Sequence, residues 1–72
     1  MTAPHYLIEV FWSEEDQGYM AIAPDLPGCS AFGETPAAAL REMEDAMASW
    51  LQACEALGRP APAPRTQPRQ AA

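Results

Sequence analysis

The sequence predicts a small α+β domain in which a three-stranded antiparallel sheet carries one long helix on one face. Three observations lead to this fold class. Short segments rich in β-forming residues alternate in period two, a proline-glycine turn joins two of them without room for a crossover helix, and a later segment has its apolar residues at helical spacing. With 72 residues, the chain can form one domain with a small core.

The segment from Tyr6 to Trp12 predicts the first strand, because it is rich in β-branched and aromatic residues. One face of this strand would hold Tyr6, Ile8, Val10 and Trp12, and the other would hold Leu7, Glu9 and Phe11. The second face is only partly polar, and an apolar remainder on the back of a sheet often indicates that another subunit covers it. The polar run from Ser13 to Gly18 then predicts a solvated hairpin loop.

Two prolines and a glycine between residues 24 and 28 exclude a helix and force the chain to reverse. Pro27-Gly28 is a favoured central pair of a type II turn, since proline presets φ and glycine accepts a positive φ. The turn separates a second strand, from Tyr19 to Ala23, from a third, from Cys29 to Phe32, which ends at Gly33. Because both connections are short, the three strands should form an antiparallel meander.

A helix of about twenty residues follows the third strand. Thr35-Pro36 predicts its start, with an N-cap hydroxyl and a proline at the first helical position. Gly58 fits the left-handed residue just past its end. The apolar positions form a single stripe made of Leu40, Met43, Met47, Trp50, Leu51, Cys54 and Leu57. This stripe is expected to pack on one face of the sheet.

From Arg59 the composition changes to alanine, arginine, glutamine and four prolines, without apolar periodicity. The sequence therefore predicts a domain over residues 1–58 and a proline-rich tail, extended or disordered, over residues 59–72. A short edge strand between Ala63 and Gln67 would be compatible with the prolines only at the margin of the sheet.

Charge is divided unevenly between these two parts. All ten acidic residues lie within 1–58 with a single arginine, which gives that part a net charge of −9, whereas three arginines give residues 59–72 a charge of +3. So acidic a domain repels nucleic acid and attracts a basic partner. The sequence shows neither a secretory signal nor an apolar run of the roughly 20 residues that span a membrane. A cytoplasmic protein with reduced thiols is therefore expected.

The residues that could support catalysis do not combine into a known type of site. The carboxylates of residues 14–16 lack the ligand spacing of a calcium loop, and the strands carry too few carboxylates for a two-metal nuclease. His5 is the only histidine and has no evident partner as a general base. Cys29 and Cys54 are expected to fill the core as small apolar side chains. We therefore expect no enzyme activity, no metal and no cofactor.

The candidates for contact with a protein partner are Trp12, Glu14, Glu15, Asp16, Asp25, Glu42 and Asp45. Their carboxylates would complement a basic partner, which mainly sets encounter rate and specificity. Trp12 ends a strand with apolar residues on both sides and is a candidate contact between subunits. Two roles are open for Asp25, because it could accept hydrogen bonds from turn amides or pair with a basic side chain of the partner.

With its elements in this order, the chain resembles the HicB-type antitoxins. The resemblance rests on Tyr6-Leu7-Ile8-Glu9-Val10, Gly18-Tyr19-Met20-Ala21, Pro24-Asp25-Leu26-Pro27-Gly28-Cys29, Gly33-Glu34-Thr35-Pro36 and the exit from Gly58 to Pro64. It covers residues 5 to 64. The proline-rich turn segment followed by the Gly33-Glu34-Thr35 helix start is its most specific part.

The resemblance implies a partial ribonuclease-H-like fold, β-β-β-α with an optional last strand. It also implies homodimers or higher oligomers that neutralise a small basic HicA-type ribonuclease toxin by occluding its active surface. Many members carry a further DNA-binding domain, for which residues 59–72 are too short and proline-rich, so no DNA binding is expected from this chain alone. Two alternatives remain open: an orphan HicB-like binding or scaffold domain without a toxin, and a degenerate ribonuclease-H-like hydrolase.

Overall fold

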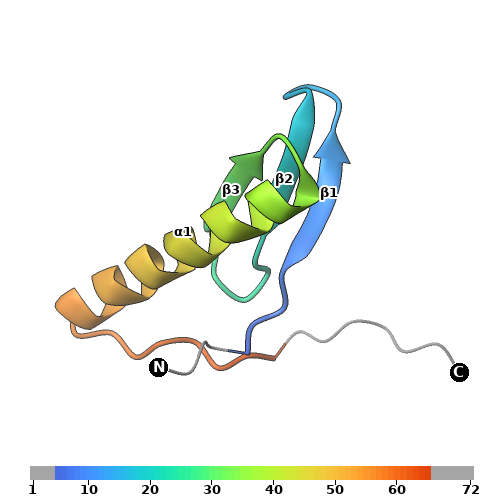
Figure 1. Ribbon diagram of the computed structural model, residues 1–72. Helices are drawn as coiled ribbons and strands as arrows, with labels where there is room; N and C mark the ends of the chain where they lie inside the picture. Colours follow the sequence, from blue (N-terminus) through green and yellow to red (C-terminus); the bar gives the residue numbers. More distant parts are fainter. Residues whose placement is uncertain (1–4, 66–72) are drawn as a thin grey trace, which may run out of the picture.

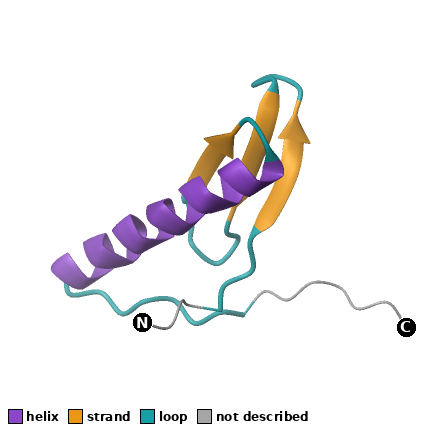
Figure 2. Ribbon diagram, in the orientation of Figure 1, coloured by secondary structure: helices purple, strands orange, loops and turns teal. Residues whose placement is uncertain are grey.

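The computed structural model describes residues 5–65. Three strands and one helix follow each other along the chain: β1 (Glu9–Ser13), β2 (Gly18–Ile22), β3 (Ser30–Gly33) and α1 (Pro36–Ala56). The strands form one antiparallel sheet in the order β1-β2-β3, and α1 crosses one face of it (Figure 1 and Figure 2). The predicted α+β class, a three-stranded antiparallel sheet with one long helix on one face, is confirmed.

The register of the sheet is unbroken in both strand pairs. Because residues that lie opposite each other share a face, the register sorts the side chains into rows across the sheet. Val10, Ala21 and Ala31 form a row on the side of α1, where Ala21 is fully buried. The neighbouring row, Phe11, Met20 and Phe32, lies on the face that is turned away from α1.

β1 begins at Glu9, three residues later than predicted. Its partner strand β2 ends at Ile22, which lies opposite Glu9, and the chain then turns away at Pro24. The segment from Tyr6 to Ile8 therefore extends past the end of β2, although both of its end residues still pack against the core. A strand boundary depends on the partner strand, which alternation within one segment does not reveal.

The connection between β2 and β3 consists of two consecutive turns. The Leu26 N–H donates to the Ala23 carbonyl (2.9 Å), and the Cys29 N–H donates to the Leu26 carbonyl (3.0 Å). Gly28 has a φ of 81°, as the third residue of a type II turn requires, so the predicted Pro27-Gly28 turn is confirmed. Ala23 and Cys29 belong to these turns, which is why β2 ends and β3 begins one residue away from the predicted positions.

α1 begins and ends with the signals that the sequence predicts. The Thr35 hydroxyl oxygen accepts a hydrogen bond from the Ala38 N–H (3.0 Å), and Pro36 is the first helical residue. At the other end Gly58 has a φ of 71°. The N–H groups of Gly58 and Arg59 donate to carbonyls of the last turn at 3.0 Å and 2.9 Å, which is the Schellman arrangement. The helix is longer than the sheet is wide, so its last turns extend beyond the strands (Figure 1).

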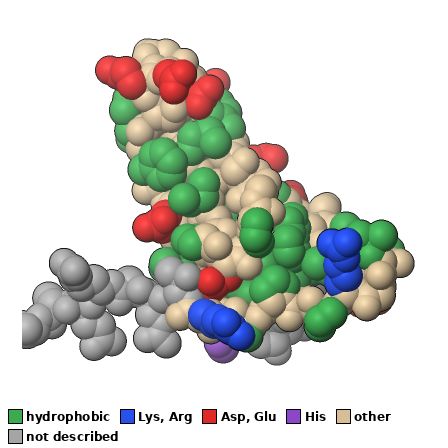
Figure 3. Space-filling model, turned by 180° about the vertical axis from the view of Figure 1, so that it is seen from behind, with side chains coloured by type: hydrophobic (Ala, Val, Ile, Leu, Met, Phe, Trp, Pro, Cys, Tyr) green, Lys and Arg blue, Asp and Glu red, His purple; other side chains and the backbone are tan. Residues whose placement is uncertain are grey.

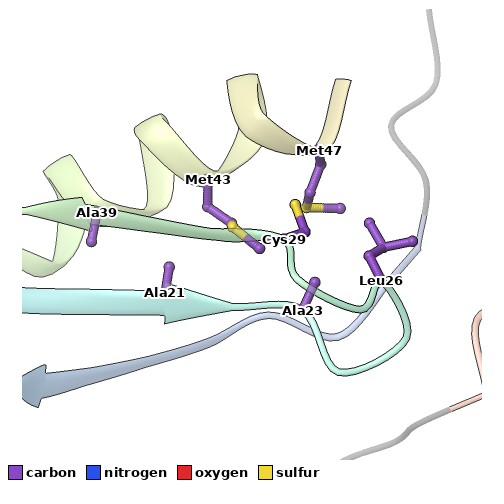
Figure 4. Close-up of a cluster of buried hydrophobic side chains, with 7 residues drawn as sticks. All are labelled: Ala21, Ala23, Leu26, Cys29, Ala39, Met43 and Met47. Atoms are coloured by element: carbon purple, nitrogen blue, oxygen red, sulfur yellow. The ribbon is translucent and has the colours of Figure 1, made fainter. Parts of the chain in front are cut away.

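The core is small and lies between α1, β2 and the loop that follows β2 (Figure 4). Its buried residues are Ala21, Ala23, Leu26, Cys29, Ala39, Met43 and Met47. Leu26 and Met43 are the largest of the fully buried side chains, so the turn segment contributes to the core as well as connecting two strands. The Trp50 indole N–H donates to the Pro27 carbonyl (3.1 Å) and joins the helix to the same loop. α1 packs mainly on β3 and least on β1, which leaves β1 exposed.

After α1 the chain passes back beneath the helix towards the segment that precedes β1 (Figure 1). Residues 59–65, the return segment, contain neither helix nor strand. The Tyr6 hydroxyl donates to the Pro62 carbonyl, and the Arg65 N–H donates to Asp25 Oδ2 (2.8 Å). The predicted edge strand is absent from residues 63–65, and residues 66 and 67 lie outside the described part of the chain. The division of the chain at residue 58 stays a prediction.

Candidate functional site

The tip of the β1–β2 hairpin presents three consecutive exposed carboxylates, Glu14, Glu15 and Asp16. Hydrogen bonds hold the loop that carries them. Ser13 Oγ donates to Asp16 Oδ2 (2.8 Å), and the Gln17 side-chain amide donates to the Glu14 carbonyl (2.6 Å). Figure 3 shows acidic side chains gathered at this end of the sheet. The tip is therefore a negatively charged surface of defined shape, which attracts basic groups.

Trp12 lies beside this tip. Its indole N–H donates to Glu14 Oε2 (2.9 Å), and its ring packs edge-on against Tyr19, with the ring centroids 5.3 Å apart and the planes at 76°. These two contacts fix the orientation of the ring, while Trp12 remains 49% exposed. An exposed aromatic ring that is already held in place loses little side-chain entropy on binding, which suits it to anchor a protein interface.

The remaining candidates lie on other elements. Glu42 and Asp45 are exposed on α1, and Asp25 is half-buried in the loop between β2 and β3. Asp25 accepts the hydrogen bond from the Arg65 N–H, a structural contact with the return segment that the sequence did not reveal. A hydrogen bond thus joins Trp12 to Glu14 of the hairpin tip, whereas Glu42 and Asp45 lie on α1 and Asp25 lies in the loop between β2 and β3.

Sequence reasoning noted Phe11 but missed the row to which it belongs. Phe11, Met20 and Phe32 lie directly opposite one another across the three strands. Phe11 is 45% exposed and Phe32 is 42% exposed. Figure 3, which looks onto this side of the molecule, shows hydrophobic side chains spread over the sheet below the acidic tip. The alternation within each strand was visible in the sequence, but the row depends on the register across two connections.

The two cysteines are free thiols in different surroundings. Cys29 is buried in the core, and this burial raises the pKa of its thiol above the ordinary value, which disfavours the nucleophilic thiolate. Cys54 is half-buried beside an open hollow of about 360 Å³ between the end of α1 and the return segment. The hollow is lined by Tyr6, Leu51, Cys54, Glu55, Arg59 and Ala61.

The described residues offer neither a metal-binding cluster nor a membrane-spanning helix. Between residues 5 and 65, no three side chains of His, Cys, Asp or Glu form a group that could hold a metal ion. The described helix is too polar to cross a membrane. The hairpin tip offers charged and aromatic groups for contact with another protein.

One known family matches the chain. The family described as "HicB_like antitoxin of bacterial toxin-antitoxin system" matches residues 6–71. No curated protein and no solved structure matched. The matched range includes all three strands, the double turn, the helix and the return segment, so the resemblance seen in the residues is confirmed over nearly the whole sequence. The chain belongs to the HicB-like antitoxins of bacterial toxin–antitoxin systems.

Proposed function

We propose that this protein binds and neutralises a small basic ribonuclease toxin of HicA type, and that it does so in the cytoplasm as a homodimer or higher homo-oligomer. Membership of an antitoxin family supports a toxin as the partner. The observation that carries the proposal is the acidic surface. Every carboxylate side chain within residues 5–65 except that of Asp25 is exposed, and only three arginines lie in the same range. Such a surface favours a basic protein and repels RNA.

Within this surface, the hairpin tip and Trp12 are the proposed centre of the toxin contact. Glu14, Glu15 and Asp16 would attract arginine and lysine side chains, and the exposed face of Trp12 can receive a cation. The carboxylates of Asp25, Glu42 and Asp45 are further candidates on other elements. Neutralisation requires only that the active surface of the toxin is covered. The antitoxin therefore contributes no catalytic group, metal or cofactor to this mechanism.

Co-expression with the neighbouring gene tests the proposal. A HicA-type partner would be encoded as a short basic open reading frame beside the gene of this protein. Expressed alone it should arrest growth, and expressed together with this chain it should be harmless and co-purify as a complex. If no complex forms and growth is the same with and without this chain, the antitoxin proposal fails.

Two sets of charge variants test where the toxin binds. The hairpin set combines Glu14→Gln, Glu15→Gln and Asp16→Asn, which remove charge but retain hydrogen-bond acceptors. The helix set, Glu42→Gln, Glu44→Gln and Asp45→Asn, removes the same number of charges from exposed positions of α1 and is the matched control. At low salt, the hairpin set should slow association with the toxin about tenfold or more, and the difference should shrink as salt screens the charges. A larger effect from the helix set would move the proposed contact from the tip to α1.

A further inference from the structure

β1 is an edge strand that lacks the usual protection against pairing. Among the described residues 5–65 it pairs only with β2, and its register with β2 runs without a bulge from Glu9 to Ser13. Edge strands are normally blunted by lysine, proline, bulges or very short length. β1 has five residues with neither lysine nor proline, and Glu9, at its first position, is its only charge. Its outer edge is therefore paired with no other strand of residues 5–65, and its backbone donors and acceptors are offered to another strand.

β1 also carries apolar side chains that are unusually exposed. Val10, Phe11 and Trp12 are consecutive, apolar and 36%, 45% and 49% exposed. Since neighbouring residues point to opposite faces, β1 exposes apolar side chains on both faces of the sheet. A single layer placed on one face would cover only half of them. A strand added beside β1 would contact both faces at once.

We propose that β1 pairs with β1 of a second copy, antiparallel and centred on Phe11, so that two three-stranded sheets join into one of six strands. This inference names the surface behind the homo-oligomer of the proposed function and does not require the toxin. In this register Phe11 lies opposite its own copy, and Val10 lies opposite Trp12 of the other protomer. The Trp12 ring, already held by Tyr19 and Glu14, would be the fixed anchor of each pair.

Charge restricts where a second copy can bind. The chain carries a net charge of −6, so most of its surface repels a second copy. Centred on Phe11, the pairing places Glu9 opposite Ser13, and the two Glu9 residues lie four positions apart, about 14 Å at 3.4 Å per residue. This separation exceeds the screening length of about 8 Å at physiological ionic strength. The two acidic tips point to opposite ends of the joined sheet and do not meet. The repulsion that remains is between Glu9 of each copy, which lies opposite Ser13, and the adjoining tip of the other copy.

Sedimentation velocity on the full-length protein tests the proposal. Because five residues from each copy make a small interface, we expect a dimer with a dissociation constant in the micromolar range. Phe11→Glu places two carboxylates opposite each other and should raise that constant about tenfold or more. Phe32→Glu is the matched control, since Phe32 lies in the same row with similar exposure but on the far strand β3. It should leave the dimer unchanged, and circular dichroism should show both variants folded.

Three results would overturn the proposal. The first is a wild-type protein that stays monomeric at several hundred micromolar. The second is a Phe11→Glu protein that dimerises like wild type. The third is an equal loss of dimer affinity in the Phe11→Glu and Phe32→Glu proteins, which would indicate stacking of two sheet faces. None of these measurements contains the toxin, so such a failure would leave the co-expression experiment to decide the antitoxin role.

A disulfide trap gives a second readout that does not depend on a disruptive change. In the proposed register the two Phe11 Cα atoms are about 4.5–5.5 Å apart, a separation that a disulfide can bridge. Phe11→Cys in a Cys54→Ala background should therefore cross-link two copies under mild oxidation, with Cys29 remaining buried. Phe32→Cys in the same background should cross-link at least about tenfold more slowly. Equal rates would contradict pairing through β1.

Discussion

Replacing Gly33 by alanine measures how closely α1 approaches the sheet. Gly33 is the last residue of β3 and is buried. A Cβ added at this position would lie 2.2 Å from the Ala39 nitrogen and 2.6 Å from the Ala38 carbonyl carbon. Both are backbone atoms of α1, so no side-chain rotation can relieve the overlap. The first turns of the helix would have to move away from the sheet.

The expected cost follows from this geometry. Extra atoms in a well-packed core typically destabilise by about 1–3 kcal/mol, and a clash with backbone belongs at the upper end of that range. We expect Gly33→Ala to lower the free energy of unfolding by about 3 kcal/mol. In a domain of 60–100 residues, each kcal/mol shifts the melting temperature by about 4–8 °C, so the Tm should fall by roughly 12–24 °C. Thermal and urea unfolding followed by circular dichroism measure both quantities.

Gly28→Ala is the matched control, because Gly28 is needed for its positive φ and not for a close approach of two backbones. Gly28 has a φ of 81°, and an added Cβ would meet no atom within 4 Å. Its replacement should therefore cost only the left-handed conformation, about 1 kcal/mol. If the Tm of the Gly33→Ala protein falls no further than the Tm of the Gly28→Ala protein, the argument that α1 touches the sheet at Gly33 is refuted.

Three further perturbations test other parts of the fold. Leu26→Ala should cost about 2–5 kcal/mol in urea unfolding, because it leaves a cavity at a fully buried position. Tyr6→Phe should cost about 0.5–1.5 kcal/mol through the lost hydrogen bond to Pro62, and an unchanged value would mean that this contact does not hold the return segment. Burial raises the pKa of the Cys29 thiol above its ordinary value, so the folded protein keeps this proton when the unfolded chain loses it. Stability should be full below about pH 9 and fall above it, and the fall should be smaller in Cys29→Ala in reducing buffer.

The parts of the fold that were predictable depend on local chemistry. The N-cap of Thr35, the helix start at Pro36 and the left-handed Gly58 all act within one turn of the helix, and the structure contains each of them. The Pro27-Gly28 turn is local in the same sense. In contrast, the start of β1 depends on Ile22, where its partner strand ends, and the sequence placed it three residues too early.

The candidate site was only partly predictable for the same reason. Three carboxylates in a hairpin loop are visible in the sequence, but the contact of Trp12 with Glu14 and Tyr19 requires the folded hairpin. The hydrogen bond from Arg65 to Asp25 joins residues 40 positions apart, and no spacing rule predicts such a contact. The sequence indicated an apolar remainder on the back of the first strand and singled out Trp12, but the exposure of β1 on both faces depends on α1 lying mainly over β3.

The proposed self-pairing and the proposed toxin contact use neighbouring parts of one hairpin, and the antiparallel geometry allows both. Self-pairing uses β1 from Glu9 to Ser13, while the toxin contact uses the carboxylates that follow Ser13. Because paired strands run in opposite directions, each acidic tip projects beyond the shared edge and remains available for binding. Trp12 is the residue that both surfaces use, since it faces the second copy and holds Glu14. A monomeric Phe11→Glu protein should therefore still bind the toxin, whereas a change at Trp12 should weaken both interactions.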